Sequence, residues 1–267
     1  LGVSSLGVLC ASVVRFLEHD MTIRALIFDV NGTLIDIETN ETQEDIYRVL
    51  ANFLNYQGMS IGRGELRDLY FQTIREQLAA SRETYPELDI VNVWRDLLTR
   101  KGNAASRTLP AEKLKQLPLI LAEMHRALAR QRLQLFPEVR SVLEQLRPYY
   151  RLGIVTDAMS PYALPELRHV GLADFFHPIV ISGDAGYRKP DARLFRKALD
   201  ILGTPAEEAV YIGNDLEQDV VAAKQIGMKT VFFCSGPNQV DPFSTPADYV
   251  IYHFAELLRA INHLAQA

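Results

Sequence analysis

A short, wholly apolar run that ends in an acidic residue and a turn most constrains how this chain folds. Residues 25–28 form such a run, and Asp29 and the turn-forming triplet Asn31-Gly32-Thr33 come just after it. Apolar runs of this length between turn residues are typical of strands buried on both faces of a parallel sheet. Similar runs recur at residues 152–156, 179–181, 209–212, 230–233 and 249–251. We therefore expect these six segments to be strands.

Helical patterns separate the strands from about residue 138 to the C-terminus. Ser160-Pro161 is typical of a helix N-cap followed by proline at the first helical position, and residues 204–207 have the pattern of a capping box. Apolar residues at helical spacing predict another helix over residues 216–226. Strands and helices that alternate in this way predict a Rossmann-like α/β fold, a parallel sheet with helices on both faces.

The stretch between the first two strands has a different pattern. No strand is evident over residues 37–135, and we expect helices at 41–56, 63–78, 90–98 and 111–130, the last interrupted by Pro118. This predicts a core of residues 21–36 and 136–267 and an inserted, all-helical cap of residues 37–135, which two linkers allow to hinge. Trp94 and the aromatic residues around it are expected in the cap core, and His125 on the cap surface.

Charge and composition exclude several classes of partner. The net charge of −5 leaves no basic footprint for nucleic acid. The apolar stretch 1–14 is too short for a membrane span and lacks the basic start of a secretory signal, so we interpret residues 1–20 as an extension before Met21. Two cysteines, Cys10 and Cys234, cannot form a disulfide framework, which favours a reducing, cytoplasmic location. The oligomeric state stays open.

Polar residues gather where the expected strands end. Because ligands bind at the carboxyl ends of strands in open parallel sheets, the candidate site residues are Asp29, Asn31, Thr33, Thr156, Asp157, Asn214, Asp215 and Asp219, with Lys189 from a turn-rich loop. Several carboxylates in one place are costly unless a cation lies among them. Oxygen ligands of this kind suit Mg²⁺.

Four segments together resemble the motifs of the haloacid dehalogenase superfamily. These are residues 28–34 (Phe-Asp-Val-Asn-Gly-Thr-Leu), 155–157 (Val-Thr-Asp), 188–191 (Arg-Lys-Pro-Asp) and 213–215 (Gly-Asn-Asp) with Asp219. Their order, spacing and strand context agree with the family, and the helical insertion corresponds to its C1-type cap. The resemblance implies a Mg²⁺-dependent hydrolase, with a phosphorylated small molecule as substrate.

The resemblance also implies a role for each residue. Asp29 is expected to be the nucleophile that forms an aspartyl-phosphate. Thr156 is expected to bind the phosphoryl oxygens, and Lys189 to neutralise the nucleophile and the transferred group. The implied metal ligands are Asp29, the backbone carbonyl of Asn31, Asp215 and Asp219. The residues assigned to substrate binding are Thr33, Thr156, Asp157 and Lys189.

Three departures from the family pattern leave alternatives open. Asn31 stands where phosphatases of the family have the Asp that acts as general acid and base, and general acid–base catalysis contributes about 10²–10⁴-fold. Asp157 replaces the usual Asn, and is either a proton relay or a helix N-cap or turn residue. Either Asn214 or Asp215 faces the metal. A degenerate protein that binds phosphate or a partner without turnover is therefore an alternative, and a dehalogenase a weaker one. A phosphonate hydrolase is disfavoured, because residues 41–78 contain no lysine.

Overall fold

Six parallel strands form one sheet at the centre of the core. The computed structural model describes residues 23–103, 108–236 and 244–266, so the predicted extension 1–20 lies outside the described residues. The sheet has the order β5-β4-β1-β6-β7-β8. Its strands are β1 (Ala25–Phe28), β4 (Arg151–Thr156), β5 (Ile179–Ile181), β6 (Ala209–Gly213), β7 (Lys229–Phe233) and β8 (Tyr249–Ile251). The six strands expected from the apolar runs and the Rossmann-like fold are confirmed.

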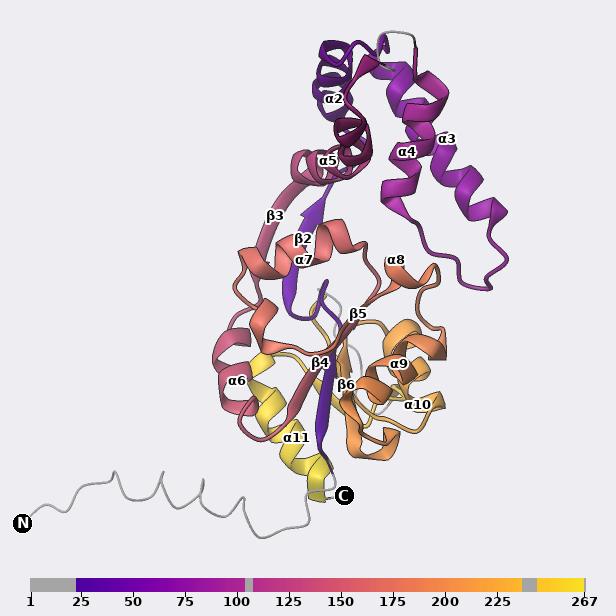
Figure 1. Cartoon of the computed structure of the whole chain (residues 1–267). Coiled ribbons are helices and arrows are strands. Elements are labelled where there is room, and N and C mark those ends of the chain that lie inside the picture. Colours follow the sequence, from indigo (N-terminus) through magenta and orange to yellow (C-terminus); the bar gives the residue numbers. More distant parts are fainter. Residues whose placement is uncertain (1–22, 104–107, 237–243, 267) are drawn as a thin grey trace, which may run out of the picture.

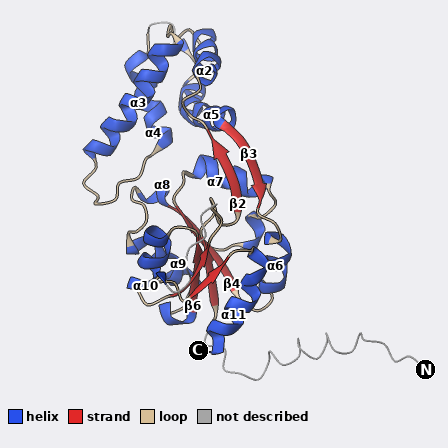
Figure 2. Cartoon of the chain, turned by 180° about the vertical axis from the view of Figure 1, so that it is seen from behind, coloured by secondary structure: helices blue, strands red, loops and turns tan. Residues whose placement is uncertain are grey.

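Helices cover both faces of this sheet (Figure 2). The helices of the core are α6 (Val139–Leu146), α7 (Ser160–His169), α8 (Ser182–Ala185), α9 (Ala192–Leu202), α10 (Ala222–Gln225) and α11 (Leu257–Gln266), with a π-helical turn η5 (Leu216–Val221) before α10. Leu26 and Phe28 of β1 pack with α6 and α11, whereas Ala25 and Ile27 pack with α9 and α10. Because both faces of β1 are buried, the strand has to be apolar throughout.

Both predicted N-caps are wrong. Ser160 is the first residue of α7 rather than its cap, and its hydroxyl instead donates to the carboxylate of Asp184 at 2.6 Å. Thr204 caps no helix, since only the 3-10 turn η4 (Ala206–Glu208) follows, with extended Pro205 before it and no side-chain cap. Strand β6 begins at Ala209, which leaves no room for a longer helix.

The structure describes four helices in the cap, which has a hydrophobic core of its own. They are α2 (Glu44–Tyr56), α3 (Arg63–Ala80), α4 (Ile90–Lys101) and α5 (Ala111–Ala129), and α5 continues through Pro118. Trp94 is fully buried in this core, as expected. The surface position predicted for His125 is wrong, because its ring is also fully buried, 4.5 Å from that of Tyr70. Burial lowers the pKa of His125 to about 4, so the imidazole is neutral and tolerates the apolar surroundings.

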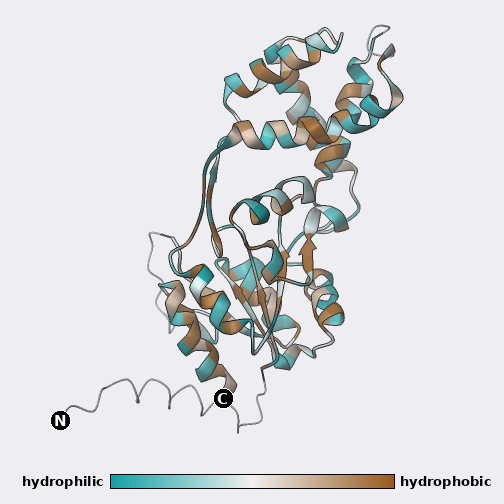
Figure 3. Ribbon diagram, turned by 60° about the vertical axis from the view of Figure 1, so that its left-hand side comes forward, coloured by the Kyte–Doolittle hydropathy of each residue, from teal (hydrophilic) through white to brown (hydrophobic). Residues whose placement is uncertain are grey.

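A two-stranded antiparallel ribbon joins the cap to the core (Figure 3). It consists of β2 (Ile35–Thr39) and β3 (Arg130–Leu135), so the prediction of no strand over residues 37–135 is wrong. Arg132 of β3 pairs with Asp36 and with Glu38 of β2, each at 2.8 Å. The residues of these two pairs are 94 and 96 positions apart in the sequence, which is why local patterns did not predict the pairing. Both chain crossings between core and cap follow this ribbon.

Among the helices that the structure describes, none is both long and apolar enough to span a membrane.

Candidate active site

The central strand β1 ends at the same edge of the sheet as its neighbours β4 and β6. The three strands are adjacent and parallel, and the chain proceeds to opposite sides of β1. Ligands bind at this kind of switch point in open α/β sheets. Asp29 follows β1, Thr156 ends β4 and Asn214 follows β6. The sheet therefore brings three of the four motifs together.

Lys189 lies between two carboxylates. Its Nζ donates to Asp29 Oδ1 at 2.8 Å and to Asp219 Oδ1 at 2.6 Å. All three residues are at least nine-tenths buried. Burial lowers the pKa of Lys189, but the two carboxylates raise it more, so that the pKa lies well above its ordinary value. The side chain is therefore an ammonium ion at neutral pH.

The two oxygens of Asp29 are held unequally. Oδ1 accepts from Lys189, whereas Oδ2 lies 3.3 Å from the hydroxyl of Thr33. That hydroxyl also lies 3.1 Å from Asn214 Oδ1, and it has one proton to donate. Burial raises the pKa of Asp29, Asp219 adds to this shift and Lys189 opposes it. Oδ2 is thus the less firmly held oxygen.

Asp219 uses both of its carboxylate oxygens inside the protein. Oδ1 accepts from Lys189 and lies 3.2 Å from the hydroxyl of Tyr211, whose single proton has a shorter contact, 2.7 Å, with the carbonyl of Val155. Oδ2 accepts from the backbone N–H groups of Asn214 at 3.1 Å and Asp215 at 3.0 Å. Asp219 therefore fixes both the lysine and the turn after β6. The contribution of Tyr211 was missed, because a tyrosine in an apolar strand gives no signal beyond core packing.

At the turn after β6, Asn214 faces the loop of the nucleophile and Asp215 faces a helix. Asp215 Oδ1 accepts from the backbone N–H groups of Glu217 at 2.9 Å and Gln218 at 2.8 Å, which is an N-cap. The side chain of Asn214 lies against Gly32, where a Cβ would come within 2.4 Å of its amide nitrogen. Gly32 also has a φ of +83°, so the close approach and the turn both require glycine. Of the two candidates, it is Asn214 that contacts the loop after Asp29, because its Oδ1 lies 3.1 Å from the hydroxyl of Thr33.

Three buried polar atoms at this edge have no hydrogen-bond partner among the described residues. They are Asn31 Oδ1, Thr156 Oγ1 and Asp157 Oδ2. A buried polar atom without a partner costs about 1–3 kcal/mol. Because these atoms lie on the segments that carry the candidate residues, a bound polar ligand would offset that cost for each of them.

The donor set fits a hard cation bound by few protein carboxylates. Within the described parts of the chain, no group of three or more His, Cys, Asp or Glu side chains is arranged around a metal position. The candidate oxygen donors around the nucleophile are the Asp29 carboxylate, the backbone carbonyl of Asn31 and the side-chain oxygen of Asn214. Mg²⁺ commonly binds through one or two carboxylates and keeps several waters, so this set suits it.

Asp157 links two loops of the site. Its Oδ1 accepts from the backbone N–H of Lys189 at 2.9 Å. Burial raises the pKa of Asp157 to about 6, Lys189 opposes this shift, and Glu87 and Asp29 add to it. The hydrogen bond is one that an asparagine would also make. The second oxygen, which has no partner in the part of the chain that the structure describes, is the one that an asparagine would replace with an N–H₂ group.

We expect Asp157→Asn to stabilise the protein at pH 8 but not at pH 4. The folded pKa of about 6 lies above the ordinary aspartate pKa of 3.8, so the ionised carboxylate costs stability, and this cost appears as the pH rises through this interval. One pKa unit is about 1.4 kcal/mol, and with partial exposure we expect a gain of about 1–2 kcal/mol at pH 8. Urea unfolding of both proteins in EDTA at the two pH values measures this. An equal difference at both values would contradict it.

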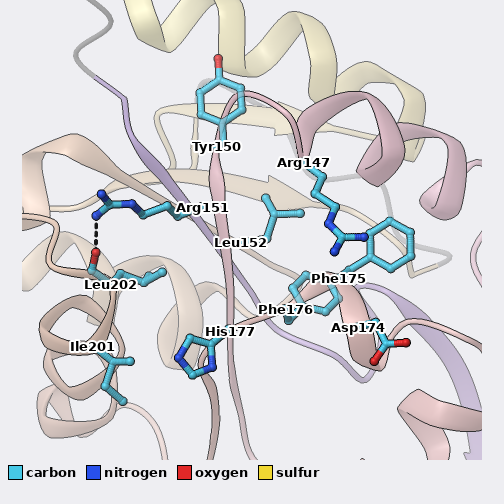
Figure 4. A pocket seen from close by; sticks show the side chains of 10 residues that line it. All are labelled: Arg147, Tyr150, Arg151, Leu152, Asp174, Phe175, Phe176, His177, Ile201 and Leu202. Atoms are coloured by element: carbon cyan, nitrogen blue, oxygen red, sulfur yellow. Dashed lines mark hydrogen bonds between the residues drawn. The ribbon is translucent and has the colours of Figure 1, made fainter.

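The hollow shown in Figure 4 lies at the other end of the sheet. It is lined by residues that include Arg151 at the start of β4, whose guanidinium donates to the carbonyl of Leu202. Thr156 lies at the opposite end of the same strand, and a strand rises about 3.3 Å per residue. This hollow is therefore separate from the candidate site.

The fold and the site together define a class: a Rossmann-like α/β core with a buried Asp–Lys–Asp cluster at the switch point, below a helical cap. Residues 26–233 match the model of the haloacid dehalogenase-like hydrolases, and the chain belongs to this family.

Several relatives are similar to this chain over different lengths. A glyceraldehyde 3-phosphate phosphatase of Pyrococcus abyssi is 40% identical over 101 residues, which cover 38% of this chain and 42% of that protein. The chain thus spans less than half of that relative. A phosphoglycolate phosphatase of Yersinia pseudotuberculosis is 28% identical over 242 residues, 90% of this chain and 94% of that protein.

Solved structures share the fold. A 2-haloacid dehalogenase from Pseudomonas syringae pv. tomato superposes with a TM-score of 0.66 at 23% identity, covering 90% of this chain and 99% of that one. The hydrolase YfnB of Bacillus subtilis, whose structure is bound to magnesium, has a TM-score of 0.51 at 22% identity, with 90% and 99% covered.

Proposed function

We propose that this protein is a Mg²⁺-dependent phosphatase for small phosphorylated molecules, with Asp29 as the nucleophile. The observation that carries the proposal is the buried Asp29–Lys189 pair at the switch point, beside the hydroxyl of Thr156 that has no partner among the described residues. A permanent ammonium next to a carboxylate and a free hydroxyl donor is an arrangement that stabilises an anion in transfer. The named relatives are phosphatases of small organic phosphates, which agrees with this proposal.

The residues perform a two-step transfer. Asp29 Oδ2 attacks phosphorus, and the bond between phosphorus and the leaving oxygen breaks, so that an aspartyl-phosphate forms. The Lys189 ammonium neutralises the negative charge at the nucleophile, and Thr156 donates its hydroxyl proton in a hydrogen bond to a phosphoryl oxygen. Water then attacks phosphorus, which releases inorganic phosphate and restores the Asp29 carboxylate.

The metal would be held by Asp29, the backbone carbonyl of Asn31 and the side-chain oxygen of Asn214. When bound, Mg²⁺ supplies positive charge to the phosphoryl oxygens. We propose Asn214 for this position rather than the originally expected Asp215 and Asp219, because Asp215 Oδ1 caps a helix and Asp219 uses both oxygens within the protein. With a single carboxylate among the ligands, we expect weak metal binding, since affinity rises with the number of charged ligands.

Asn31 limits which leaving groups depart. An amide cannot give a proton to a leaving alkoxide, and this contribution is worth about 10²–10⁴-fold. Leaving groups that depart without a proton are not affected by its absence. The proposal therefore favours acyl phosphates and activated esters over simple alkyl phosphates.

The test is release of phosphate from acetyl phosphate and from para-nitrophenyl phosphate, with Mg²⁺ and with EDTA. We expect turnover of both compounds in Mg²⁺ and its loss in EDTA. A protein that binds phosphate but hydrolyses neither compound is instead a degenerate binder. Turnover that is unchanged in EDTA contradicts the role of the metal.

One observation favours a second candidate, hydrolysis of a carbon–halogen bond. Asp219 is occupied by Lys189, Tyr211 and backbone N–H groups, so Asp29 is the carboxylate of this cluster left for chemistry. A dehalogenase of the family uses such a carboxylate on carbon and needs no metal. Release of halide from 2-chloropropionate in EDTA, with no phosphate released from acetyl phosphate, would identify that activity.

A further inference from the structure

One loop of the cap reaches toward the two loops of the core that carry catalytic residues (Figure 1). These catalytic loops are the loop after β4, which follows Thr156, and the loop after β5, which leads to Lys189. It connects α3 to α4 and comprises residues 81–89, which we call the cap strap. Pro86 and Tyr187 form an antiparallel bridge. The Glu87 N–H donates to the carbonyl of Gly186 at 3.1 Å, and the Arg188 N–H donates to that of Tyr85 at 2.9 Å. The backbone pairing thus ends one residue before Lys189.

The carboxylate of Glu87 is linked through Ser182 to the loop after β4. Its Oε2 accepts from the hydroxyl of Ser182 at 2.8 Å, and Ser182 is fully buried. The same hydroxyl oxygen accepts from the backbone N–H of Ala158 at 3.0 Å. Ala158 lies two residues after Thr156, so Ser182 connects Glu87 to the loop that carries the phosphate-binding hydroxyl. The other oxygen of Glu87 accepts from the Leu88 N–H at 2.9 Å.

The two catalytic loops are also joined to each other. Asp157 accepts from the backbone N–H of Lys189 at 2.9 Å. Gly183 packs closely against both the loop after β4 and the cap strap. A Cβ at this position would lie 2.9 Å from the carbonyl oxygen of Ala158 and 3.5 Å from that of Leu88. The strap, the loop after β4 and the loop after β5 therefore pack as one unit.

We propose that Glu87 is a positioning residue that the cap supplies to the active site. Through Ser182 it holds the loop of Thr156, and through the strap backbone it holds the loop that ends at Lys189. The catalytic groups of the core reach their working positions only when the strap is in place. Both oxygens of Glu87 are engaged within the protein, so it acts through these loops and does not touch the reacting atoms. The inference rests on the proposed phosphatase function for its kinetic consequence alone.

The first test does not depend on activity. We compare amide hydrogen exchange in the wild type, Glu87→Ala, Glu87→Gln and Glu83→Ala. Glu83 is the matched control, because it is a strap glutamate that pairs with Arg193 of α9 instead of a catalytic loop. In Glu87→Ala we expect exchange in residues 154–160 and 182–190 to accelerate by about tenfold or more, since local opening costs less. Glu87→Gln and Glu83→Ala are expected to stay close to the wild type. Unchanged exchange in Glu87→Ala overturns the proposal, whatever the activity.

The second test uses the kinetics of acetyl phosphate hydrolysis. We expect Glu87→Ala to lower kcat by about 10- to 100-fold with little change in KM, because small displacements of catalytic groups have effects of this size. Glu87→Gln should restore most of the rate, because its amide oxygen still accepts from Ser182 and the variant loses only the bond from the neighbouring Leu88 N–H. A double variant with Ser182→Ala should lose no more than Glu87→Ala alone, because the two act in one chain. Additive losses, or equal losses in Glu83→Ala, contradict the role of Glu87. An inactive wild type contradicts the phosphatase proposal instead, and the exchange test still decides on Glu87.

Discussion

Asp29→Asn is expected to abolish turnover of both acetyl phosphate and para-nitrophenyl phosphate. An amide is a far poorer nucleophile than a carboxylate, and loss of a covalent nucleophile costs roughly 10⁴- to 10⁶-fold in rate. The same change removes the carboxylate from the proposed metal ligands, so we also expect weaker binding of Mg²⁺. The measurement is phosphate release with saturating Mg²⁺, together with trapping of the phosphoenzyme by hydroxylamine, which cleaves acyl phosphates.

The fold should survive this substitution. Asn has the shape of Asp, and Lys189 keeps its ion pair with Asp219 at 2.6 Å. Burial already raises the pKa of Asp29, which means that its charge is costly in the folded protein, so a neutral side chain there costs little. The control is Asp45→Asn on α2, whose carboxylate is exposed and pairs with Arg48. We expect that variant to keep its full rate. Residual turnover by Asp29→Asn within tenfold of the wild type would rule out Asp29 as the nucleophile.

Asn31→Asp is expected to accelerate the hydrolysis of esters with poor leaving groups. The new carboxyl group can give a proton to the leaving alkoxide and take one from water, which is worth about 10²–10⁴-fold. The structure has room for it, because Asp and Asn have the same shape and Asn31 Oδ1 is buried without a partner among the described residues. Acetyl phosphate should gain little, since its leaving group departs without a proton.

A series of aryl phosphates measures this difference. For the wild type, the rate should fall steeply as the pKa of the leaving phenol rises. For Asn31→Asp the dependence should be shallow, so that the two lines diverge at high leaving-group pKa. Equal acceleration of all substrates would show that the carboxylate acts on the metal or on the phosphoryl group and not as an acid. If Asn31→Asp is active and the wild type is not, the wild-type site is intact but catalytically inactive. Binding of phosphate or of a partner then becomes the function to examine.

Much of the fold followed from the sequence, because a strand buried on both faces must be apolar along its whole length. This requirement acts on three to five consecutive residues, so residues 25–28 and the other five runs predicted the sheet without knowledge of their partners. The same logic placed Asp29 and Thr156 at one edge, since parallel strands end together. Helical periodicity predicted the four cap helices, although it misplaced His125, which a neutral ring allows to be buried.

The tertiary structure decided whatever depends on contacts between distant segments. Pairing of β2 with β3 joins residues 91 to 100 positions apart, and no local pattern encodes that partner. The different directions of the Asn214 and Asp215 side chains depended on the backbone of one turn, where Asp215 Oδ1 accepts from two N–H groups at the start of a helix. In the sequence, nothing distinguishes Glu87 from other polar loop residues. The folded structure brings its carboxylate into contact with the hydroxyl of Ser182. The sequence by itself determined which segments are buried and which polar residues follow them. Only the tertiary structure determined which of those side chains contact one another, because each contact depends on the backbone positions of two segments that are distant in the sequence.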